Sequence, residues 1–318
     1  MTNSRAFAET YVQPLVAGLL ALVTLIGLIG PAIKSPQPHD IPVGIVQGGG
    51  SQFDFLSSSA GGPFKVMTYD RELAARDAID SRDIDGALVL GPGGPKLIVA
   101  GAAGDGVTGV ITAVFTQALA KQGQALTVEV VHPFAFGDPH GLILYFVVLA
   151  IVISTLIVNA LVGLGRRAGL LPTVAVVAVY GLVAAPVAMG LATWIAGDYG
   201  AGFWTATALV ALASAALGAV VAGMARLLGR VGVALSALVA VLFDLVCSGG
   251  PIGSSLLPDA YRWFAPAMPA GQVYSGMRGA LYFDDAGVSD PVFVLSLWLL
   301  AGLVLLAVSR FTVRGADR

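Results

Sequence analysis

The sequence predicts an α-helical polytopic membrane protein with six transmembrane helices and an extracytoplasmic α/β domain inserted after the first helix. Three observations predict this class. Apolar residues make up 57% of the 318 residues and charged residues only 11%, whereas soluble proteins have roughly 25% charged residues. Six apolar stretches are long enough to cross about 30 Å of hydrocarbon. Between the first two stretches, strand and helix patterns alternate.

The apolar stretches are 14–33, 142–164, 170–196, 203–225, 231–247 and 291–309. The first follows Arg5 and is interpreted as a retained signal anchor, because its apolar run is longer than that of a usual signal peptide. A cleaved signal peptide is the alternative. Residues 1–33 therefore form an N-terminal segment and the first helix, and residues 142–318 form a five-helix bundle.

Basic residues predict the orientation of these helices. With the N-terminus in the cytoplasm, the inner segments carry eight basic and two acidic residues, and the outer segments carry nine basic and sixteen acidic residues. This bias places both termini in the cytoplasm and the segments 34–141 and 248–290 outside. The composition, rich in Ala, Gly and Val, is typical of a high-GC bacterium, so the expected location is the bacterial plasma membrane.

The outer domain, 34–141, has the predicted order β-β-α-β-β-α-β. The first helix is expected over 70–83, with Asp70 as its N-cap, and the second over 106–123. The first helix would turn its apolar side chains inward, namely Leu73, Ala74, Ala78 and Ile79. The strands are expected at 41–46, 64–69, 86–90, 96–100 and 126–131.

The outer segment 248–290 begins with a turn-rich stretch and continues with a helical spacing that Pro266 and Pro269 interrupt. This pattern predicts two short helices that dip into the outer leaflet or lie along it, where non-helical backbone must be buried against protein. The aromatic residues of this segment are of the kinds found at membrane interfaces: Trp263, Phe264, Tyr274 and Tyr282.

The sequence shows no pattern of catalytic chemistry. It has no Walker A motif and no G-x-S-x-G elbow. Its single cysteine, Cys247, and three histidines form no metal-ligand spacing. We therefore expect no enzyme activity, no cofactor and no metal site. The absence of a basic run argues against nucleic acid as a partner.

Three residues inside the spans are candidates for a transport pathway: Asp244, Pro186 and Asn159. Asp244 would face the bundle interior as a pathway or proton-sensing group, or would extend toward the outer surface. Pro186 would supply a hinge or notch, or only a packing kink. Small residues four apart in the span 203–225 predict close helix packing, within the bundle or across a dimer.

The layout of one span, a large outer α/β domain and five further spans resembles that of ABC-2-type exporter permeases, especially the phage-infection-protein-like branch. The resemblance covers nearly the whole chain. It rests on the domain run VGIV…FKVMTYDRELAARDAIDSRDIDGALVL…KLIVAGAAG and on the outer segment. That segment is similar to the family's P…LP…P-x-x-P…R pattern at Pro251, Leu257, Pro258, Pro266, Pro269 and Arg278.

The resemblance implies a half-transporter that forms a homodimer and binds a separate cytoplasmic ATPase. Such permeases move amphiphiles, lipids, drugs or polymers outward. Arg166 and Arg167, in the inner loop after the second span, would match the family's coupling helix; without the resemblance they are topology determinants or a contact for a cytoplasmic partner. The fifth span and the following re-entrant segment would line the exit.

Two other functions remain open at this point. The chain could be a scaffold of an envelope or secretion complex, whose outer domain binds envelope proteins and whose spans are an anchor in the lipid bilayer. It could also be an ion-coupled exporter that uses Asp244, although such carriers usually show internal repeats. The identity of the substrate does not follow from the sequence.

Overall fold

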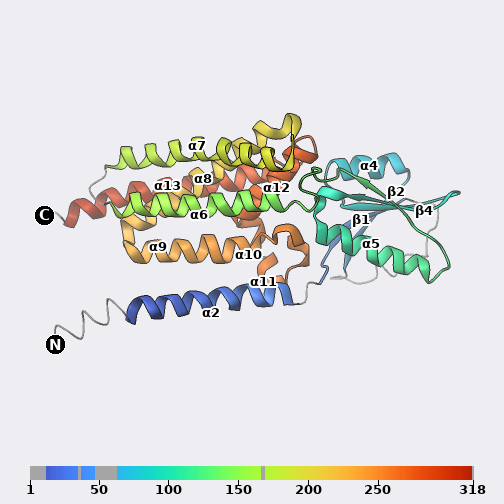
Figure 1. Ribbon diagram of the computed structural model, residues 1–318, viewed down its shortest axis with the longest axis horizontal. Helices are drawn as coiled ribbons and strands as arrows, with labels where there is room; N and C mark the ends of the chain where they lie inside the picture. Colours follow the sequence, from blue (N-terminus) through green and yellow to red (C-terminus); the bar gives the residue numbers. More distant parts are fainter. Residues whose placement is uncertain (1–11, 35–36, 47–62, 166–168, 317–318) are drawn as a thin grey trace.

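The computed structural model describes residues 12–34, 37–46, 63–165 and 169–316. The molecule is elongated, with a bundle of helices at one end and a sheet domain at the other (Figure 1). The helices of the bundle run along the long axis. The first residues of α2 and the last residues of α13 lie at the end of the bundle that is remote from the sheet (Figure 1), as the prediction of two termini on one side requires.

Within the described residues, five helices are long and apolar enough to cross a membrane. They are Leu142–Leu164, Leu170–Ala196, Gly200–Leu228, Arg230–Ile252 and Ser289–Arg310. The multi-pass membrane class with an inserted α/β domain is thus confirmed. The first predicted span forms the helix α2 (Gln13–Lys34), but its apolar helical stretch is the shorter Gly18–Ala32. The membrane span predicted for 14–33, which would bring the total to six, therefore stays a prediction.

The helix α8 (Phe203–Leu228) is the centre of the bundle, with α6 (Leu142–Leu164), α7 (Leu170–Ala196) and α13 (Ser289–Ala316) around it. In its candidate span 67% of the most hydrophobic window is buried, against 22–44% in the other four spans. Small residues allow this packing, because a Cβ at Gly302 of α13 would lie 2.6 Å from the Cβ of Ala219. The small residues of α8 therefore serve packing within the bundle.

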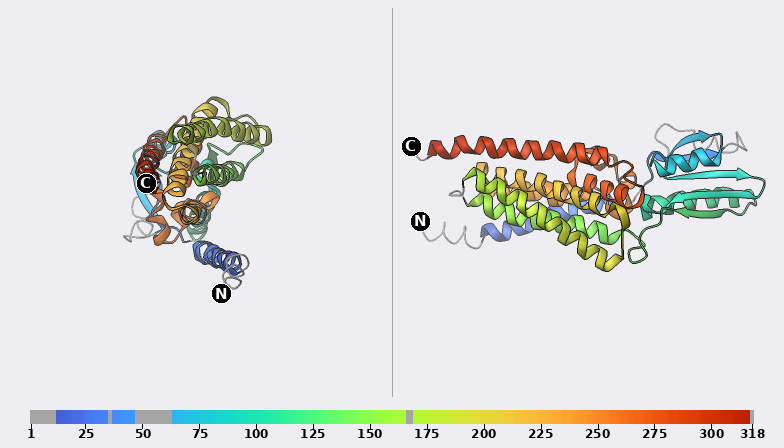
Figure 2. Two further views of the ribbon diagram at one scale, coloured as in Figure 1. Left: turned by 90° about the vertical axis from the view of Figure 1, so that its left-hand side faces the viewer. Right: turned by 90° about the horizontal axis from the view of Figure 1, so that it is seen from above.

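The fourth candidate span, Arg230–Ile252, which corresponds to the predicted fifth span 231–247, is not a uniform helix. It consists of α9 (Arg230–Ala237), a π-helical stretch η5 (Leu238–Asp244), α10 (Leu245–Cys247) and the short turn η6 (Gly250–Ile252). π-Helical turns are rare and occur frequently at functional sites. Asp244 is the last residue of this stretch. The helix α2 lies at the edge of the bundle beside this span (Figure 2).

The outer domain is a five-stranded sheet in the order β2-β1-β3-β4-β5. All neighbouring strands are parallel except β3 and β4, which are antiparallel. The strands are β1 (Ile41–Val46), β2 (Phe64–Tyr69), β3 (Gly86–Gly91), β4 (Gly94–Ala100) and β5 (Thr127–Val131). The predicted order of strands and helices is confirmed.

One helix covers each face of the sheet, so alternate residues of the central strands enter two separate cores (Figure 1). On one face, α5 (Asp105–Ala120) packs Ile111 and Phe115 against Leu88 and Leu97. On the other face, α4 (Glu72–Asp80) packs Ile79 against Ala87 and Ile98. A strand presents successive side chains to opposite faces, which explains this division.

Two details of the predicted first helix are wrong. The helix begins at Glu72, and its N-cap is Arg71, which makes no side-chain capping bond, so Asp70 is not the cap. Leu73 is 62% exposed, whereas Ala75, Ala78 and Ile79 are buried. Because the contact with the sheet sets the rotation of so short a helix, the inward stripe runs through Ala75, Ala78 and Ile79, at spacings of three and four residues, and leaves Leu73 outside.

The outer segment connects the bundle to the domain. It contains η7 (Ser254–Leu256), α11 (Asp259–Arg262), η8 (Ala265–Ala267) and α12 (Pro269–Tyr282), so the two predicted short helices are present as α11 and α12. Leu256 enters the core of the outer domain, while Val273 and Met277 of α12 enter the core of the bundle. The segment therefore holds the two parts together.

Candidate functional site

The junction between the outer domain and the bundle is crossed by two arginines that point in opposite directions. Arg82, in the loop after α4, donates hydrogen bonds from Nη1 to the carbonyl oxygens of Ser275 at 3.1 Å and Ala286 at 3.2 Å. Its Nη2 lies 3.0 Å from the Ser275 hydroxyl oxygen. Its guanidinium also stacks over the Phe283 ring, 5.3 Å from the centroid. The outer domain is thus bonded to α12 and the turn after it.

Arg278, on α12, makes the reciprocal contact. Its Nη1 donates hydrogen bonds to the carbonyl oxygens of Ala102, at 3.2 Å, and Ala103, both in the turn η3 (Gly101–Ala103) of the outer domain. Its guanidinium lies over the Tyr274 ring, 4.9 Å from the centroid. Its Nε is buried and has no hydrogen-bond partner among the described residues.

Asp85 faces these two arginines at the start of β3. Burial raises the pKa of Asp85 to about 6, although the charges of Arg278 and Arg82 act in the opposite direction. Burial likewise lowers the pKa of Arg82 to about 10, with the nearby charge of Arg278 as a second cause. The junction therefore holds charged groups in a partly dehydrated environment, where electrostatic interactions are stronger than in water.

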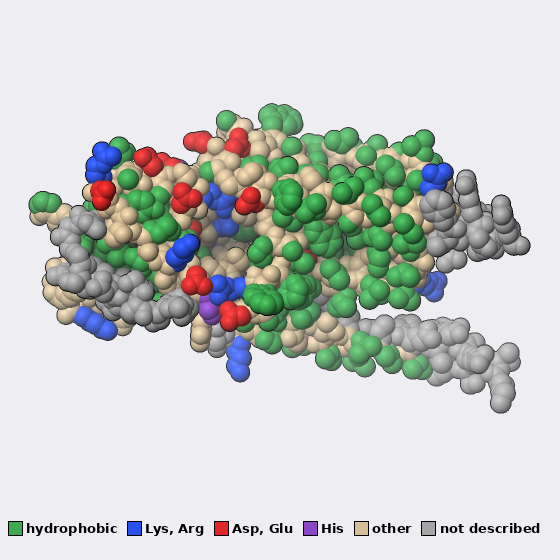
Figure 3. Space-filling view, turned by 180° about the vertical axis from the view of Figure 1, so that it is seen from behind, with side chains coloured by type: hydrophobic (Ala, Val, Ile, Leu, Met, Phe, Trp, Pro, Cys, Tyr) green, Lys and Arg blue, Asp and Glu red, His purple; other side chains and the backbone are tan. Residues whose placement is uncertain are grey.

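Two polar cavities lie at this junction and share part of their lining. The larger has a volume of about 360 Å³ and the smaller about 240 Å³. Both are lined by Ser254, Ser255, Ser275 and Arg278. Charged side chains gather around the junction, whereas the bundle surface beside it is hydrophobic (Figure 3). We call the larger cavity the polar cavity.

An apolar cavity of about 350 Å³ lies on the bundle side. It is lined by Ile29 and Ala32 of α2, Tyr145 and Leu149 of α6, and Leu245 and Leu257. The chain segment 245–257 contributes residues to this cavity and also to the polar cavity, through Cys247 and Ser248. One short segment therefore borders a polar space and an apolar space at the end of the bundle next to the sheet domain.

Asp244 is 1% exposed and is bonded to the start of α12. Its two carboxylate oxygens accept a hydrogen bond from the backbone N–H of Ala270, at 2.8 and 3.0 Å. The N-terminus of a helix favours a carboxylate, because its first N–H groups lack partners within the helix. Asp244 therefore faces protein, as one of the two predicted alternatives required, and ties the fourth span to α12.

Asn159 lies on α6, where buried polar side chains of α6 and α8 contact one another. Its Nδ2 donates to the carbonyl oxygen of Thr155 at 2.9 Å, and Thr155 and Ser214 exchange a hydrogen bond at 2.8 Å. The Oδ1 of Asn159 is buried with no partner among the described residues. Pro186 lies within the continuous helix α7. Among the described residues, no hydrogen bond joins Asn159, Pro186 and Asp244.

The predicted prolines of the outer segment mark where its helices begin. Pro258 is the N-cap of α11 and Pro269 is the first residue of α12. Pro251 lies in η6 beside the apolar cavity, and Pro266 lies in η8 beside the polar cavity. Proline suits such first-turn positions, since its missing N–H would have no partner there.

The predicted interfacial aromatics divide into two groups. Trp263 is 87% exposed and Phe264 47% exposed, as residues at a membrane interface would be. Tyr274 is buried and donates its hydroxyl to the carbonyl oxygen of Gly141 at 3.2 Å, and Tyr282 packs against Phe134 of the outer domain. The prediction is therefore wrong for the buried Tyr274, because α12 turns this face toward the junction, whereas Tyr282 is half-buried there.

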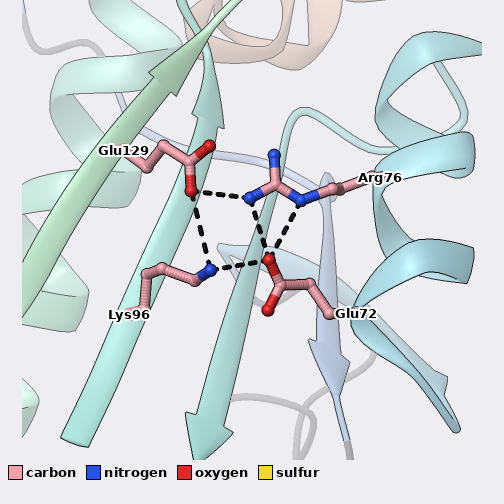
Figure 4. Close-up of polar contacts among 4 residues, drawn as sticks. All are labelled: Glu72, Arg76, Lys96 and Glu129. Atoms are coloured by element: carbon pink, nitrogen blue, oxygen red, sulfur yellow. Dashed lines mark hydrogen bonds and ion pairs between the residues drawn. The ribbon is translucent and has the colours of Figure 1, made fainter. Parts of the chain in front are cut away.

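A second charged cluster lies between α4 and the strands β4 and β5 (Figure 4). Arg76 bonds Glu72 at 2.8 Å and Glu129 at 2.6 Å, and Lys96 lies 2.6 Å from Glu72. The hydrogen bond from Lys96, followed by that from Arg76, lowers the pKa of Glu72. The two positive and two negative charges of this cluster balance one another.

The remaining predicted site residues, Arg166 and Arg167, lie outside the described residues. The described residues hold no group of three or more His, Cys, Asp or Glu side chains that could bind a metal. Sequence reasoning missed Arg82, Asp85 and Ser275. The only sequence signal for Arg82 is its position in the polar run 81–83, and that signal names no partner.

Searches of family models, curated proteins and solved structures find no match to this chain.

Proposed function

We propose that this protein is the permease subunit of an exporter that moves an amphiphilic molecule, such as a lipid, drug or lipid-linked polymer, outward across the bacterial plasma membrane. One observation carries the proposal. The segment 245–257 borders both the polar cavity and the apolar cavity, where the outer domain meets the bundle. A molecule with a polar and an apolar end requires two such environments next to each other.

The positions of these cavities support outward movement. The polar cavity lies beyond the outer end of the fourth span, and the apolar cavity lies between α2, α6 and that span. An apolar chain held beside α2 remains at the depth of the lipid, while its head group leaves the membrane. The π-helical stretch ending at Asp244 gives this span a local irregularity, of a kind that occurs frequently at functional sites.

The energy source and assembly in this proposal follow the resemblance to ABC-2-type permeases. Two copies form a homodimer with six spans each and both termini in the cytoplasm. A separate cytoplasmic ATPase binds the inner loop that contains Arg166 and Arg167. A closed two-fold arrangement is the commonest oligomer and would enclose a symmetric pathway.

The test uses everted membrane vesicles from native host cells, which contain any cytoplasmic ATPase partner, with and without production of the full chain. A fluorescent phospholipid in the medium should become protected from a membrane-impermeant quencher when ATP is added. The double variant Arg166→Ala/Arg167→Ala should abolish the ATP dependence while the protein remains in the membrane. Protection that is equal with and without the chain contradicts the proposal.

One observation favours the alternative of an envelope scaffold. The strand β5 is an edge of the sheet, and its Val128 and Val130 are 39% and 53% exposed. Exposed edge strands can pair with a strand of another protein. If the vesicles show no transport, in-cell crosslinking from position 128 or 130 should identify an envelope partner under this alternative. The absence of both transport and crosslinks excludes both functions.

A further inference from the structure

The outer segment bends into the bundle at residues 261–267, which we call the elbow. At its start, Tyr261 of α11 donates its hydroxyl hydrogen to the carbonyl oxygen of Leu28 in α2 at 2.7 Å. At its end, the carbonyl oxygen of Ala267 in η8 accepts a hydrogen bond from Nε1 of Trp298 in α13 at 2.8 Å. The elbow is therefore bonded to two long helices of the bundle, and α11 lies beside the end of α2 (Figure 1).

These two hydrogen bonds set the depth of the elbow. Leu28 lies six residues before Lys34, the charged last residue of α2, and Trp298 lies eight residues after Asp290, in the first turn of α13. With a rise of 1.5 Å per residue, the elbow lies about 9–12 Å below these charged helix ends. The head-group layer on each side of a bilayer is only about 5–8 Å thick. With the charged helix ends at the membrane surface, the elbow reaches the depth of the acyl chains.

One side of the elbow is an exposed aromatic pair, Trp263 and Phe264. The Phe264 ring also packs against Phe243 of the fourth candidate span, with 5.1 Å between the ring centroids. Close to the two bonded residues in the sequence, Ile26 of α2 and Leu297 of α13 are exposed as well. The aromatic pair therefore continues the exposed apolar surface of the long helices, as is typical of residues that contact a membrane.

The other side of the elbow faces the polar cavity. Three elbow residues belong to the lining of this cavity, namely Arg262, Ala265 and Pro266. Arg262 forms ion pairs with Asp40 at 3.2 Å and with Asp259 at 3.1 Å, so its charge is neutralised on this side. Trp263 and Phe264, between Arg262 and Ala265 in the sequence, do not belong to the lining. The elbow is thus a thin wall with a polar side and an aromatic side.

We infer that the elbow is embedded in the membrane leaflet next to the sheet domain, where Trp263 and Phe264 contact lipid acyl chains, and that it forms the wall between those chains and the bundle-side part of the polar cavity. The inference goes beyond the proposed function and does not rest on it, because it requires only that the bundle spans a membrane. The depth of the elbow and the apolar surroundings of the pair favour lipid over a protein partner in the water.

The experiment measures the reaction of single introduced cysteines with a small charged methanethiosulfonate in the full chain reconstituted in phosphatidylcholine vesicles. Trp263→Cys should react at least about tenfold more slowly than Gln122→Cys, because a thiol among acyl chains does not ionise to the reactive thiolate. Gln122 is exposed on the outer domain after α5. Leu182→Cys, on the exposed face of α7, gives the rate for a lipid-facing thiol. Equal rates at positions 263 and 122 overturn the inference and leave Trp263 available to a protein partner.

Ala265→Cys is the matched variant that tests the wall. Position 265 lies two residues from position 263 but belongs to the lining of the polar cavity. It should react at least about tenfold faster than position 263, because a thiol in a polar cavity can ionise. Equal rates at the two positions overturn the wall. Cys247 is buried, and the unchanged protein gives its background rate.

Tryptophan fluorescence tests the same contact should a cysteine variant fail to fold. The difference in emission between the unchanged protein and Trp263→Phe isolates the emission of Trp263. In vesicles of phosphatidylcholine brominated in the upper half of one acyl chain, this emission should be quenched more strongly than by iodide in the water. Stronger quenching by iodide overturns the inference. Because neither measurement involves transport, its failure is distinguishable from failure of the proposed function.

Discussion

Arg82 and Arg278 cross the same junction in opposite directions, each donating to backbone carbonyls of the other part of the molecule. Backbone carbonyls have fixed positions, so each arginine reaches its acceptors only when the surfaces of the outer domain and the bundle are aligned. Together with Leu256, which enters the core of the outer domain, the two arginines make the domain and the bundle one mechanical unit.

The reciprocal arginine contacts should stabilise docking of the domain. Arg82→Ala removes hydrogen bonds to two carbonyls and a hydroxyl, and we expect a loss of about 1–3 kcal/mol and faster proteolysis between the domain and α6. Thermal unfolding in detergent measures the first effect, and limited chymotrypsin digestion, which can cleave after the exposed Phe136, measures the second. Arg71→Ala, at an exposed position on the same domain, is the control and should change neither. Equal effects of the two variants would show that Arg82 does not hold the junction.

Asp85 should make stability depend on pH. Its folded pKa of about 6 lies above the ordinary aspartate value, so the folded state binds the proton more tightly than the unfolded state. The stability contributed by the protonated form is present below about pH 4 and is lost as pH rises to about 6. The loss is on the order of 1–3 kcal/mol, and denaturant unfolding across this range measures it. Asp85→Asn should flatten this dependence, whereas the exposed Asp83→Asn should retain it.

Asp244 should be needed as an acceptor more than as a charge. Asp244→Asn retains an oxygen for the Ala270 N–H and is expected to keep most of the stability, while Asp244→Ala leaves that N–H unpaired in a buried position. The free energy of unfolding of Asp244→Ala should be about 1–3 kcal/mol lower than that of the unchanged protein. Thermal unfolding in detergent compares the two. In the ion-coupled alternative, Asp244→Asn folds normally but loses transport driven by a pH gradient, whereas in the proposed function ATP-driven transport continues.

Close packing of α8 should make some glycines irreplaceable. A Cβ at Gly302 would lie 2.6 Å from both the Cβ of Ala219 and the N of Val220, whereas a Cβ at Gly190 of α7 would meet nothing within 4 Å. Gly302→Ala should therefore destabilise the bundle by about 1–3 kcal/mol through overpacking. Gly190→Ala should be neutral or slightly stabilising, because alanine favours a helix by about 0.5–1 kcal/mol. Identical unfolding temperatures would contradict the packing described for α8 and α13.

The sequence by itself determined where the helices and strands lie. The predicted spans 142–164 and 170–196 coincide with α6 and α7, and the strands 41–46 and 64–69 coincide with β1 and β2. Hydrophobic periodicity and runs of apolar residues are local properties, so they can be identified from the sequence without knowledge of the fold. The same applies to Asp244, which stands out as a charged group in an apolar span, whereas Arg278 was singled out only by the family resemblance.

Only the tertiary structure decided which of these residues meet. The partner of Asp244 is the N–H of Ala270, 26 residues along the chain, and the partners of Arg278 lie about 175 residues away. The outward position of Leu73 and the inward positions of Tyr274 and Tyr282 likewise depend on the surfaces packed against α4 and α12. Periodicity shows which face of a helix is apolar. Burial of a polar group depends on hydrogen-bond partners supplied by segments that are distant in the sequence. The sequence carries no local signal that such segments lie close together in the fold.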